Sequence, residues 1–238
     1  QAIDGIRGAL APAGIDLVVG LAIKWYNNCV PDHLHLATPS FGENGVAVLI
    51  GNTANLWEPF KQAVKEENLC GRGSSHPLND YVKTKVVTAI EQEVSVTAQY
   101  RWEHETAPER VVAIQRMGQA AGLAFLDEKT YLSLHPTYGP WIAFRAVVLL
   151  DMEFPKDIPK PAPMTCPATD EEMAAAAKGM SEALEKAGEY SNRTDGAWEL
   201  FLKARDMYIL GKQHRYCDEM VTYHYGKSLS YLEGIAHG

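Results

Sequence analysis

The sequence predicts an α+β protein, with a mixed body up to about residue 153 and a helical C-terminal cap. In the body, short apolar segments bounded by glycine or turn residues alternate with segments of helical spacing. The composition changes over residues 154–172, FPKDIPKPAPMTCPATDEE, whose five prolines indicate an extended linker. Residues 173–238 return to helical patterns rich in alanine and charge. We expect this C-terminal part to pack on the body as one functional unit.

Each element of the body has its own local signal. Apolar runs predict strands, apolar residues three and four apart predict helices, and a proline in the first turn favours a helix start. In chain order these signals predict a helix at 3–14 broken at Pro12, strands at 16–27 and 45–52, a helix at 54–69, a strand in 88–102 that alternates from Val94 onward, a helix at 108–128 with Pro108 in its first turn, and strands at 130–136 and 141–150.

Composition and charge limit the classes of partner. The 238 residues are 46% hydrophobic and 22% charged, which suffices for a sizeable core. A net charge of −8 argues against broad contact with nucleic acid or an anionic membrane, because both need a basic face. No apolar run approaches the roughly 18 residues of a membrane span. No signal peptide is visible, although the chain begins at Gln1 rather than Met.

The cysteines predict a reducing compartment. Cys29, Cys70, Cys166 and Cys217 show no Cys-x-x-Cys spacing, so a redox dithiol or a zinc clip has no local support. A chain of this size does not need disulfides for stability. We therefore expect reduced thiols and a cytoplasmic protein.

Arg145 stands inside the most apolar strand, WIAFRAVVLL at residues 141–150. Alternation along a strand would place Trp141, Ala143, Arg145 and Val147 on one face, and Ile142, Phe144, Ala146 and Val148 on the other. Because an unpaired buried arginine costs several kcal/mol, the site must supply an anion. One interpretation is an internal Asp or Glu. The other is a ligand carboxylate or phosphate, which the planar guanidinium would bind.

Small residues are concentrated in the helix predicted at 108–128. Such residues let a backbone or a flat ligand approach closely, and tight helix–sheet packing is the structural alternative. They are Gly118, Ala120, Ala121, Gly122 and Ala124.

Recognised catalytic motifs are absent from the sequence. It contains no phosphate-binding P-loop, no G-x-G-x-x-G, no H-E-x-x-H, no G-x-S-x-G and no D-x-H-x-x-G. His33 and His35 would share a strand face but lack an evident third metal ligand, and His104 and His214 have no further support as ligands. His135 is expected to be a turn or core residue. We predict no protein-bound metal.

Four segments together resemble the CblC family of cobalamin-processing chaperones, also called MMACHC. They are KWYNNCVP (24–31), IQRMGQAAGLAF (114–125), LHPTYGPWIAFRAVVLLD (134–151) and QHRYCDE (213–219). The third is the most specific, with its HP-x-x-G-x-W-x-x-x-R-x-V-V-L-L pattern. The resemblance covers roughly 15–155 and is patchy beyond.

The resemblance implies a fold and an activity. The fold is similar to flavin nitroreductases, with an antiparallel sheet flanked by helices and an added helical cap. The family binds cobalamin with the tail base off cobalt and removes its upper ligand. Methyl- and adenosylcobalamin are dealkylated by glutathione, and cyanocobalamin is reductively decyanated with electrons from a thiol or from FAD or FMN. A thiol oxidase side activity and a CblD-like partner protein are also implied, with a monomer or a ligand-dependent dimer.

The resemblance also assigns site residues. Arg145 and Arg215 would bind the carboxylates of glutathione and support its thiolate, and Lys227 is the nearest candidate for a third cation. No protein residue is assigned as catalytic, because the thiol of glutathione is the nucleophile. Cobalamin contacts are expected from Gln99, Val112, Ala113, Ile114, Gln115, Gln119, Gly122, Leu126, Asp127, Glu128, Ser133, His135, Trp141 and Phe144.

The chain departs from the family pattern at three positions. Gln119 stands where the family has a histidine, Ser133 where it has a cysteine, and Tyr131 where it has a glycine. Two other functions remain open from the sequence. One is a carrier that binds cobalamin and does no chemistry, which would have no need of the arginine pair. The other is a flavin-dependent oxidoreductase of the nitroreductase type, against which no flavin phosphate site is visible.

Overall fold

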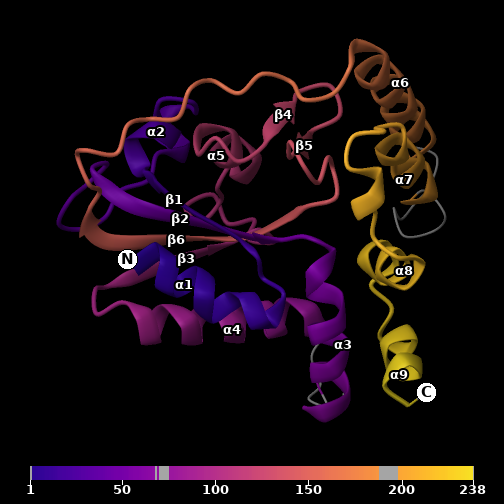
Figure 1. Cartoon of the computed structure of the whole chain (residues 1–238), viewed down its shortest axis with the longest axis horizontal. Helices are drawn as coiled ribbons and strands as arrows, with labels where there is room; N and C mark the ends of the chain where they lie inside the picture. The colour runs from indigo at the N-terminus through magenta and orange to yellow at the C-terminus, as the bar shows by residue number, and fades with distance from the viewer. Residues whose placement is uncertain (1, 68, 70–74, 188–197, 238) are drawn as a thin grey trace.

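The computed structural model describes residues 2–67, 69, 75–187 and 198–237, with side chains described through residue 234. Its centre is a four-stranded antiparallel sheet in the order β1-β2-β6-β3 (Figure 1). These strands are β1 (Leu17–Ala22), β2 (Gly45–Asn52), β6 (Ala143–Glu153) and β3 (Ala98–Trp102). Every residue of β2 is buried, because β2 lies inside the sheet and both of its faces are covered.

Helices cover both faces of the sheet (Figure 1). One face packs on α1 (Ala2–Leu10), α3 (Trp57–Glu66) and α4 (Pro77–Glu93). The other face packs on α2 (Ile23–Asn27) and α5 (Ile114–Ala120), beside a hairpin of β4 (Phe125–Asp127) and β5 (Leu132–Leu134). The alternating strand residues therefore fill two separate apolar clusters, one on each side of the sheet.

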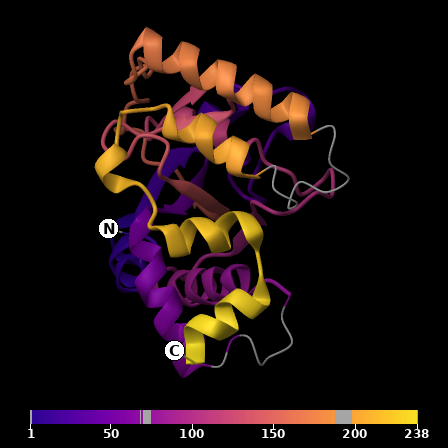
Figure 2. The same cartoon turned by 90° about the vertical axis from the view of Figure 1, so that its right-hand side faces the viewer.

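The C-terminal part is helical and lies along one side of the body (Figure 2). Residues 154–169 contain no helix or strand and cross the face that carries α5, where the side chain of Pro161 lies against Gly122. Then follow α6 (Asp170–Ala187), α7 (Trp198–Asp206), α8 (Asp218–Gly226) and α9 (Leu229–His237). The predicted α+β class, the antiparallel sheet and the helical C-terminal part are confirmed.

Several expected elements have other bounds or another type. The expected strand at 16–27 ends at Ala22, and α2 follows because Ile23, Trp25 and Tyr26 are buried on one short helical turn. The expected strand at 88–102 begins only at Ala98. Helix α4 extends to Glu93, with buried residues at helical spacing along Val82, Val86, Ala89 and Ile90.

The helix expected at 108–128 is the shorter α5. Gly122 has a φ of +68°, which ends the helix, and Phe125–Asp127 pair with Leu132–Leu134 as a hairpin. His33 and His35 do not share a strand face, because Asp32–Leu34 form a 3₁₀ turn. Gly118 lies tightly against Phe144, where an added Cβ would come within 2.5 Å of the ring, so the packing interpretation of the small residues holds there.

A β-bulge at Arg145 changes the faces predicted for β6. Ile50 of β2 pairs with Ala146 and Gly51 pairs with Phe144, which leaves Arg145 as the extra residue. Phe144 and Val147, expected on opposite faces, therefore pack in the same cluster. Trp141, Ala146 and Val148 fill the other cluster. Strict alternation was wrong here because it assumed an unbroken ladder.

Candidate functional site

The candidate site is an open cavity of about 410 Å³ beside the bulge of β6. Its lining combines α5, the β4–β5 hairpin and β6 with residues of α7, α8 and the segment just after α8. The lining residues are Glu103, Ile114, Gln115, Tyr131, Leu132, Ser133, Pro140, Ile142, Ala143, Phe144, Arg145, Arg205, His224 and Lys227. The body and the C-terminal helices thus build one cavity together.

Arg145 is only partly neutralised by the protein. Its side chain is buried, with the residue 4% exposed. Nε donates to Oδ1 of Asn52 at 2.7 Å, and Nη1 lies 3.6 Å from Oε1 of Glu103. Nη2 is buried without a hydrogen-bond partner. The ion pair with Glu103 agrees with the interpretation that an internal carboxylate balances Arg145. The pair is long, however, and Nη2 remains unpartnered, which agrees with the interpretation that a ligand binds there.

Arg205 adds a second buried guanidinium. It contacts the rings of both Trp141 and Tyr216, at 4.6 Å and 4.9 Å from their centroids. Nε donates to the carbonyl of Pro140 at 3.0 Å, and Nη2 donates to the carbonyls of Pro140 and Ile142. These partners are neutral, so they fix the guanidinium without cancelling its charge.

His224 and Lys227 bring further nitrogen atoms to the cavity. The Nδ1 of His224 is buried and has no partner, and desolvation together with Lys227, Arg205 and Arg145 holds the pKa of His224 well below 6.5, so the ring is neutral at pH 7. Lys227 follows α8 with a φ of +52°. Desolvation and the Arg145 guanidinium lower the pKa of Lys227 to about 8, although part of this residue remains exposed to water.

The lining is cationic in an acidic protein. Arg145, Arg205 and Lys227 carry positive charge, and Glu103 is the acidic residue among the lining residues. The whole chain has a net charge of −8. A local excess of cations around an unsatisfied guanidinium N–H can bind an anion such as a carboxylate, phosphate or thiolate.

The rest of the lining is uncharged. Ile114, Leu132 and Phe144 are apolar, and the Oγ of Ser133 is buried without a partner. Gln115 donates from Nε2 to the backbone carbonyl of Tyr131 at 3.2 Å. The cavity therefore presents two kinds of surface, one for an anion and one for an apolar or amide-bearing group.

Some of the site residues expected from the sequence lie in this cavity. Arg145 and Lys227 line it with Ile114, Gln115, Ser133 and Phe144. Others have internal partners. Asp127 is buried and accepts hydrogen bonds from Thr130 and Tyr208. The remaining expected residues outside the lining are Gln99, Val112, Ala113, Gln119, Gly122, Leu126, Glu128, His135 and Trp141. Their role as cobalamin contacts stays a prediction.

Arg215 lies outside the lining of this cavity. Its Nε is 2.8 Å from Oδ1 of Asp206, its Nη1 is 3.3 Å from Oδ1 of Asp218, and the guanidinium lies 5.4 Å from the centroid of Trp141. These partners connect the end of α7 to the start of α8. The structure does not bring Arg215 and Arg145 together in one lining, and the assignment of Arg215 to a thiol site stays a prediction.

The sequence reasoning missed Glu103, Arg205 and His224 as lining residues. Arg205 lies within KARDMY and His224 within TYHYG, and neither segment has a local pattern that marks a site. Only their packing against Pro140 and Arg145 gives them a place in the cavity. Burial of a charged side chain depends on the tertiary fold, so no periodicity could have found them.

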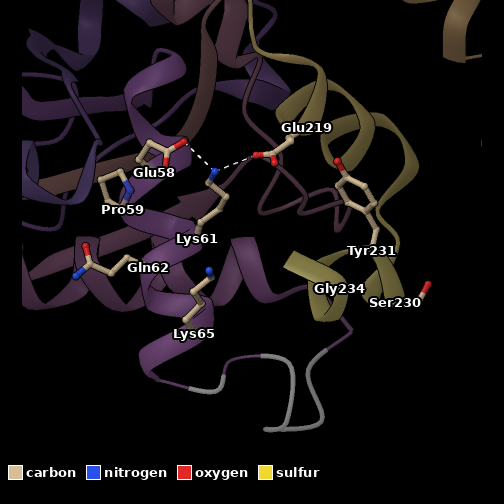
Figure 3. Close-up of a pocket in the computed structure, with 9 residues that line it drawn as sticks. All are labelled: Glu58, Pro59, Lys61, Gln62, Lys65, Glu219, Ser230, Tyr231 and Gly234. Atoms are coloured by element: carbon tan, nitrogen blue, oxygen red, sulfur yellow. Dashed lines mark hydrogen bonds and ion pairs between the residues drawn. The ribbon is translucent and has the colours of Figure 1, made fainter. Parts of the chain in front are cut away.

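A larger pocket of about 890 Å³ lies between α3 and the last two helices (Figure 3). There the Nζ of Lys61 is 2.9 Å from Oε1 of Glu58 and 2.9 Å from Oε2 of Glu219. Among the described residues, none of the buried polar atoms that lack a partner belongs to this lining. Lys61, Glu58 and Glu219 satisfy one another there, so the cationic cavity with its unpartnered buried groups is the better candidate site.

Comparison with known proteins identifies the family. Residues 17–186, well over half of the chain, match the model of the methylmalonic aciduria and homocystinuria type C (MMACHC) family. The chain belongs to this family. The match includes α5, β6 and the hairpin of the cavity, whereas Arg205, His224 and Lys227 lie beyond it.

Two curated relatives carry the same name, cyanocobalamin reductase / alkylcobalamin dealkylase. The protein from Bos taurus is 24% identical over 185 residues, which are 69% of this chain and 62% of the bovine protein. The protein from Gallus gallus is also 24% identical over 185 residues, which are 71% of this chain and 75% of the chicken protein. The match thus spans somewhat less than two thirds of the bovine relative.

A solved structure has the same fold. The C. elegans B12-trafficking protein CblC, described as a human MMACHC homologue, superposes with a TM-score of 0.67 over 99% of this chain and 94% of that chain, at 19% identity. The likeness therefore includes the C-terminal helices, where the MMACHC family model does not reach beyond residue 186.

Three further features bear on other functions. No helix in the described ranges is both long and apolar enough to cross a membrane. The described residues also contain no group of three His, Cys, Asp or Glu side chains placed to hold a metal ion. Cys29, Cys166 and Cys217 are free thiols, and Cys70 lies outside the described residues.

Proposed function

We propose that the protein binds cobalamin with the tail base off cobalt and removes its upper ligand, using glutathione as the thiol. Membership of the MMACHC family and the printed names of the bovine and chicken relatives support cobalamin processing. The observation that supports a thiol site is the buried, unpartnered Nη2 of Arg145 in a cationic cavity. A carrier without chemistry would not need that arrangement.

The two kinds of surface suggest how the ligands divide the cavity. An apolar and amide-bearing surface from Ile114, Gln115, Ser133 and Phe144 suits the corrin edge. Arg145, Arg205 and Lys227 suit the two carboxylates of glutathione. The same cations would favour the thiolate over the thiol, because they stabilise the anion.

The chemistry then follows from position. A thiolate held beside the corrin attacks the alkyl carbon, the carbon–sulfur bond forms, and the electron pair of the cobalt–carbon bond stays on cobalt. For cyanocobalamin the upper ligand would leave as cyanide once cobalt is reduced, with the thiol, or reduced FAD or FMN in its place, as the electron donor. The protein contributes orientation and electrostatics, while cobalt and sulfur carry the reaction.

The proposal extends to the cellular setting. It places the protein in the cytoplasm, with a CblD-like partner that receives cobalamin and with a monomer or a ligand-dependent dimer as the working unit. The free thiols at Cys29, Cys166 and Cys217 support a reducing compartment. The net charge of −8 supports a partner other than nucleic acid.

A visible spectrum tests the proposal. Methylcobalamin added to the protein should shift to shorter wavelength as its base leaves cobalt, and glutathione should then convert it to the demethylated form. Binding without any glutathione-dependent change would favour the carrier function. A base-on spectrum throughout would contradict the proposed binding mode.

A further inference from the structure

Tyr131 has an unusual backbone for its residue type. Its φ is +55°, in the left-handed region that favours glycine. Among the described residues, Lys227 is the other non-glycine residue with a positive φ. Both line the same cavity, although they are almost a hundred positions apart in the chain. Strained backbone of this kind concentrates at binding sites, where the surrounding structure enforces it.

The β4–β5 hairpin enforces the conformation of Tyr131. The backbone N–H of Tyr131 donates to the carbonyl of Asp127 at 2.8 Å, and the N–H of Lys129 donates to Oδ1 of Asp127 at 3.0 Å. Oδ2 of the same carboxylate accepts from the hydroxyls of Thr130 and Tyr208, both at 2.7 Å. The turn is therefore fixed by a buried hub, and glycine would fit its last position without strain.

The side chain of Tyr131 gains little from folding. The residue is 66% exposed, and its ring stacks on no aromatic ring or cation among the described residues. The hydrogen bond from Gln115 goes to the backbone carbonyl of Tyr131, which any residue at this position could supply. An exposed aromatic ring on a strained backbone is thus a cost to the unliganded protein, and its benefit must come from something the cavity holds.

We propose that Tyr131 is a ligand-contacting residue whose ring packs on cobalamin where the macrocycle extends past the cavity mouth. This rests on the proposed function, and adds a contact specific to this chain. A cavity of about 410 Å³ is smaller than a cobalamin, so part of such a ligand must lie at the rim. The phenol ring offers an apolar face for the corrin and a hydroxyl for its amide side chains.

Substitutions can separate the ring from the backbone. Tyr131→Gly and Tyr131→Asn both relieve the left-handed strain and remove the ring, whereas Tyr131→Phe keeps the ring. Phe41→Gly is the matched control, because Phe41 is a 37% exposed aromatic in a turn outside the cavity. For each variant we would measure the melting temperature without ligand, the Kd of methylcobalamin by absorbance and the Kd of S-methylglutathione by calorimetry.

We expect Tyr131→Gly and Tyr131→Asn to melt at or above the wild-type temperature and to bind methylcobalamin about 5- to 10-fold more weakly. Tyr131→Phe should stay within about 2-fold, and Phe41→Gly should leave affinity unchanged. S-methylglutathione should bind all of them equally, because the cations are intact.

Other outcomes overturn the inference in distinct ways. Wild-type affinity in Tyr131→Gly and Tyr131→Asn would show that the ring makes no contact, with the proposed function intact. Equal weakening in Tyr131→Phe would also refute ring packing. A wild-type protein that binds no cobalamin would overturn both this inference and the proposed function.

Discussion

The Nε of Arg145 donates a 2.7 Å hydrogen bond to Oδ1 of Asn52, while Nη2 of the same guanidinium is buried without a partner. Asn52 ends β2, and Arg145 is the extra residue of the bulge that faces the end of β2. The bulge thus places Nε of the guanidinium against Asn52 and leaves Nη2 without a partner in the protein. Without the bulge, Arg145 would belong to a regular ladder, next to the apolar residues 146–150.

Replacing Arg145 by Gln tests the role of this guanidinium. The substitution removes the charge and keeps a planar polar group, so we expect glutathione affinity to fall roughly 10- to 150-fold, from the loss of about 1.5–3 kcal/mol of charged hydrogen bonding. Cobalamin affinity should change much less. Thiol titration of methylcobalamin demethylation gives the first quantity, and absorbance gives the second.

Arg7→Gln provides a surface control, because Arg7 pairs with Asp4 on α1. If Arg145→Gln keeps wild-type thiol dependence and only melts earlier, the Glu103 pair is the whole role of Arg145. Equal losses of glutathione and cobalamin affinity, together with a lower melting temperature, would likewise indicate that Arg145 serves only to pair with Glu103.

Arg215 and Arg145 should behave differently if the lining of the cavity determines thiol binding. Arg215→Gln breaks the ion pairs with Asp206 and Asp218, and we expect a loss of about 1 kcal/mol or less in unfolding free energy, because partly exposed pairs contribute little. Thiol affinity should stay within about 2-fold. A loss as large as that of Arg145→Gln, non-additive in the double variant, would instead support the thiol role that the sequence resemblance implies for Arg215.

Lys227 should make anion binding depend on pH. Its pKa is lowered to about 8 by desolvation and Arg145, so the ammonium loses its proton as pH rises through about 8 and its attraction for an anion is lost. S-methylglutathione affinity, measured by calorimetry from pH 6.5 to 9.5, should therefore fall through this range. Because arginine keeps its charge, Lys227→Arg should remove that part of the decline. Identical pH profiles for the two proteins would show that Lys227 does not titrate there.

Glu172 should stabilise the junction between α6 and the segment after α7. Its Oε2 accepts from the N–H of Thr169 at 2.8 Å, and Oε1 accepts from the N–H groups of Ile209 and Leu210 at 2.5 and 2.8 Å. Glu172→Ala leaves these donors unpaired, so we expect a loss of about 2–4 kcal/mol in unfolding free energy by urea titration. The exposed neighbour Glu171→Ala should stay within about 0.5 kcal/mol.

The same carboxylate should add acid sensitivity. Burial by itself would raise its pKa, but the N–H donors of Thr169, Leu210 and Ile209 outweigh this and lower the pKa of Glu172 below 4.5. Its contribution to stability is then complete above the unfolded pKa and is lost as pH falls through the lower folded pKa. The difference in unfolding free energy between wild type and Glu172→Ala should shrink below about pH 4.5. A constant difference would mean that the hydrogen bonds do not favour the ionised form.

The sequence by itself determined the elements whose signal is local. The apolar runs of β2 and β6, the proline-rich segment before α6 and the α+β class all follow from periodicity and turn residues. It also marked Arg145, because a permanent charge in an apolar strand demands a partner wherever the strand lies. The family resemblance rested on such contiguous segments, and the family match covers them up to residue 186.

Only the tertiary structure decided how the cavity is built. Arg205, His224 and Lys227 join Arg145 because α7 and α8 pack beside the bulge of β6, and the bulge itself depends on pairing with Gly51, which is ninety-four positions away. The left-handed turn at Tyr131 likewise depends on Asp127 and on Tyr208 from the C-terminal part. Hydrophobic periodicity indicates which side of an element is buried. Strand register, backbone strain and the burial of a charge depend instead on the residues that pack against the element, and these come together only when distant segments meet.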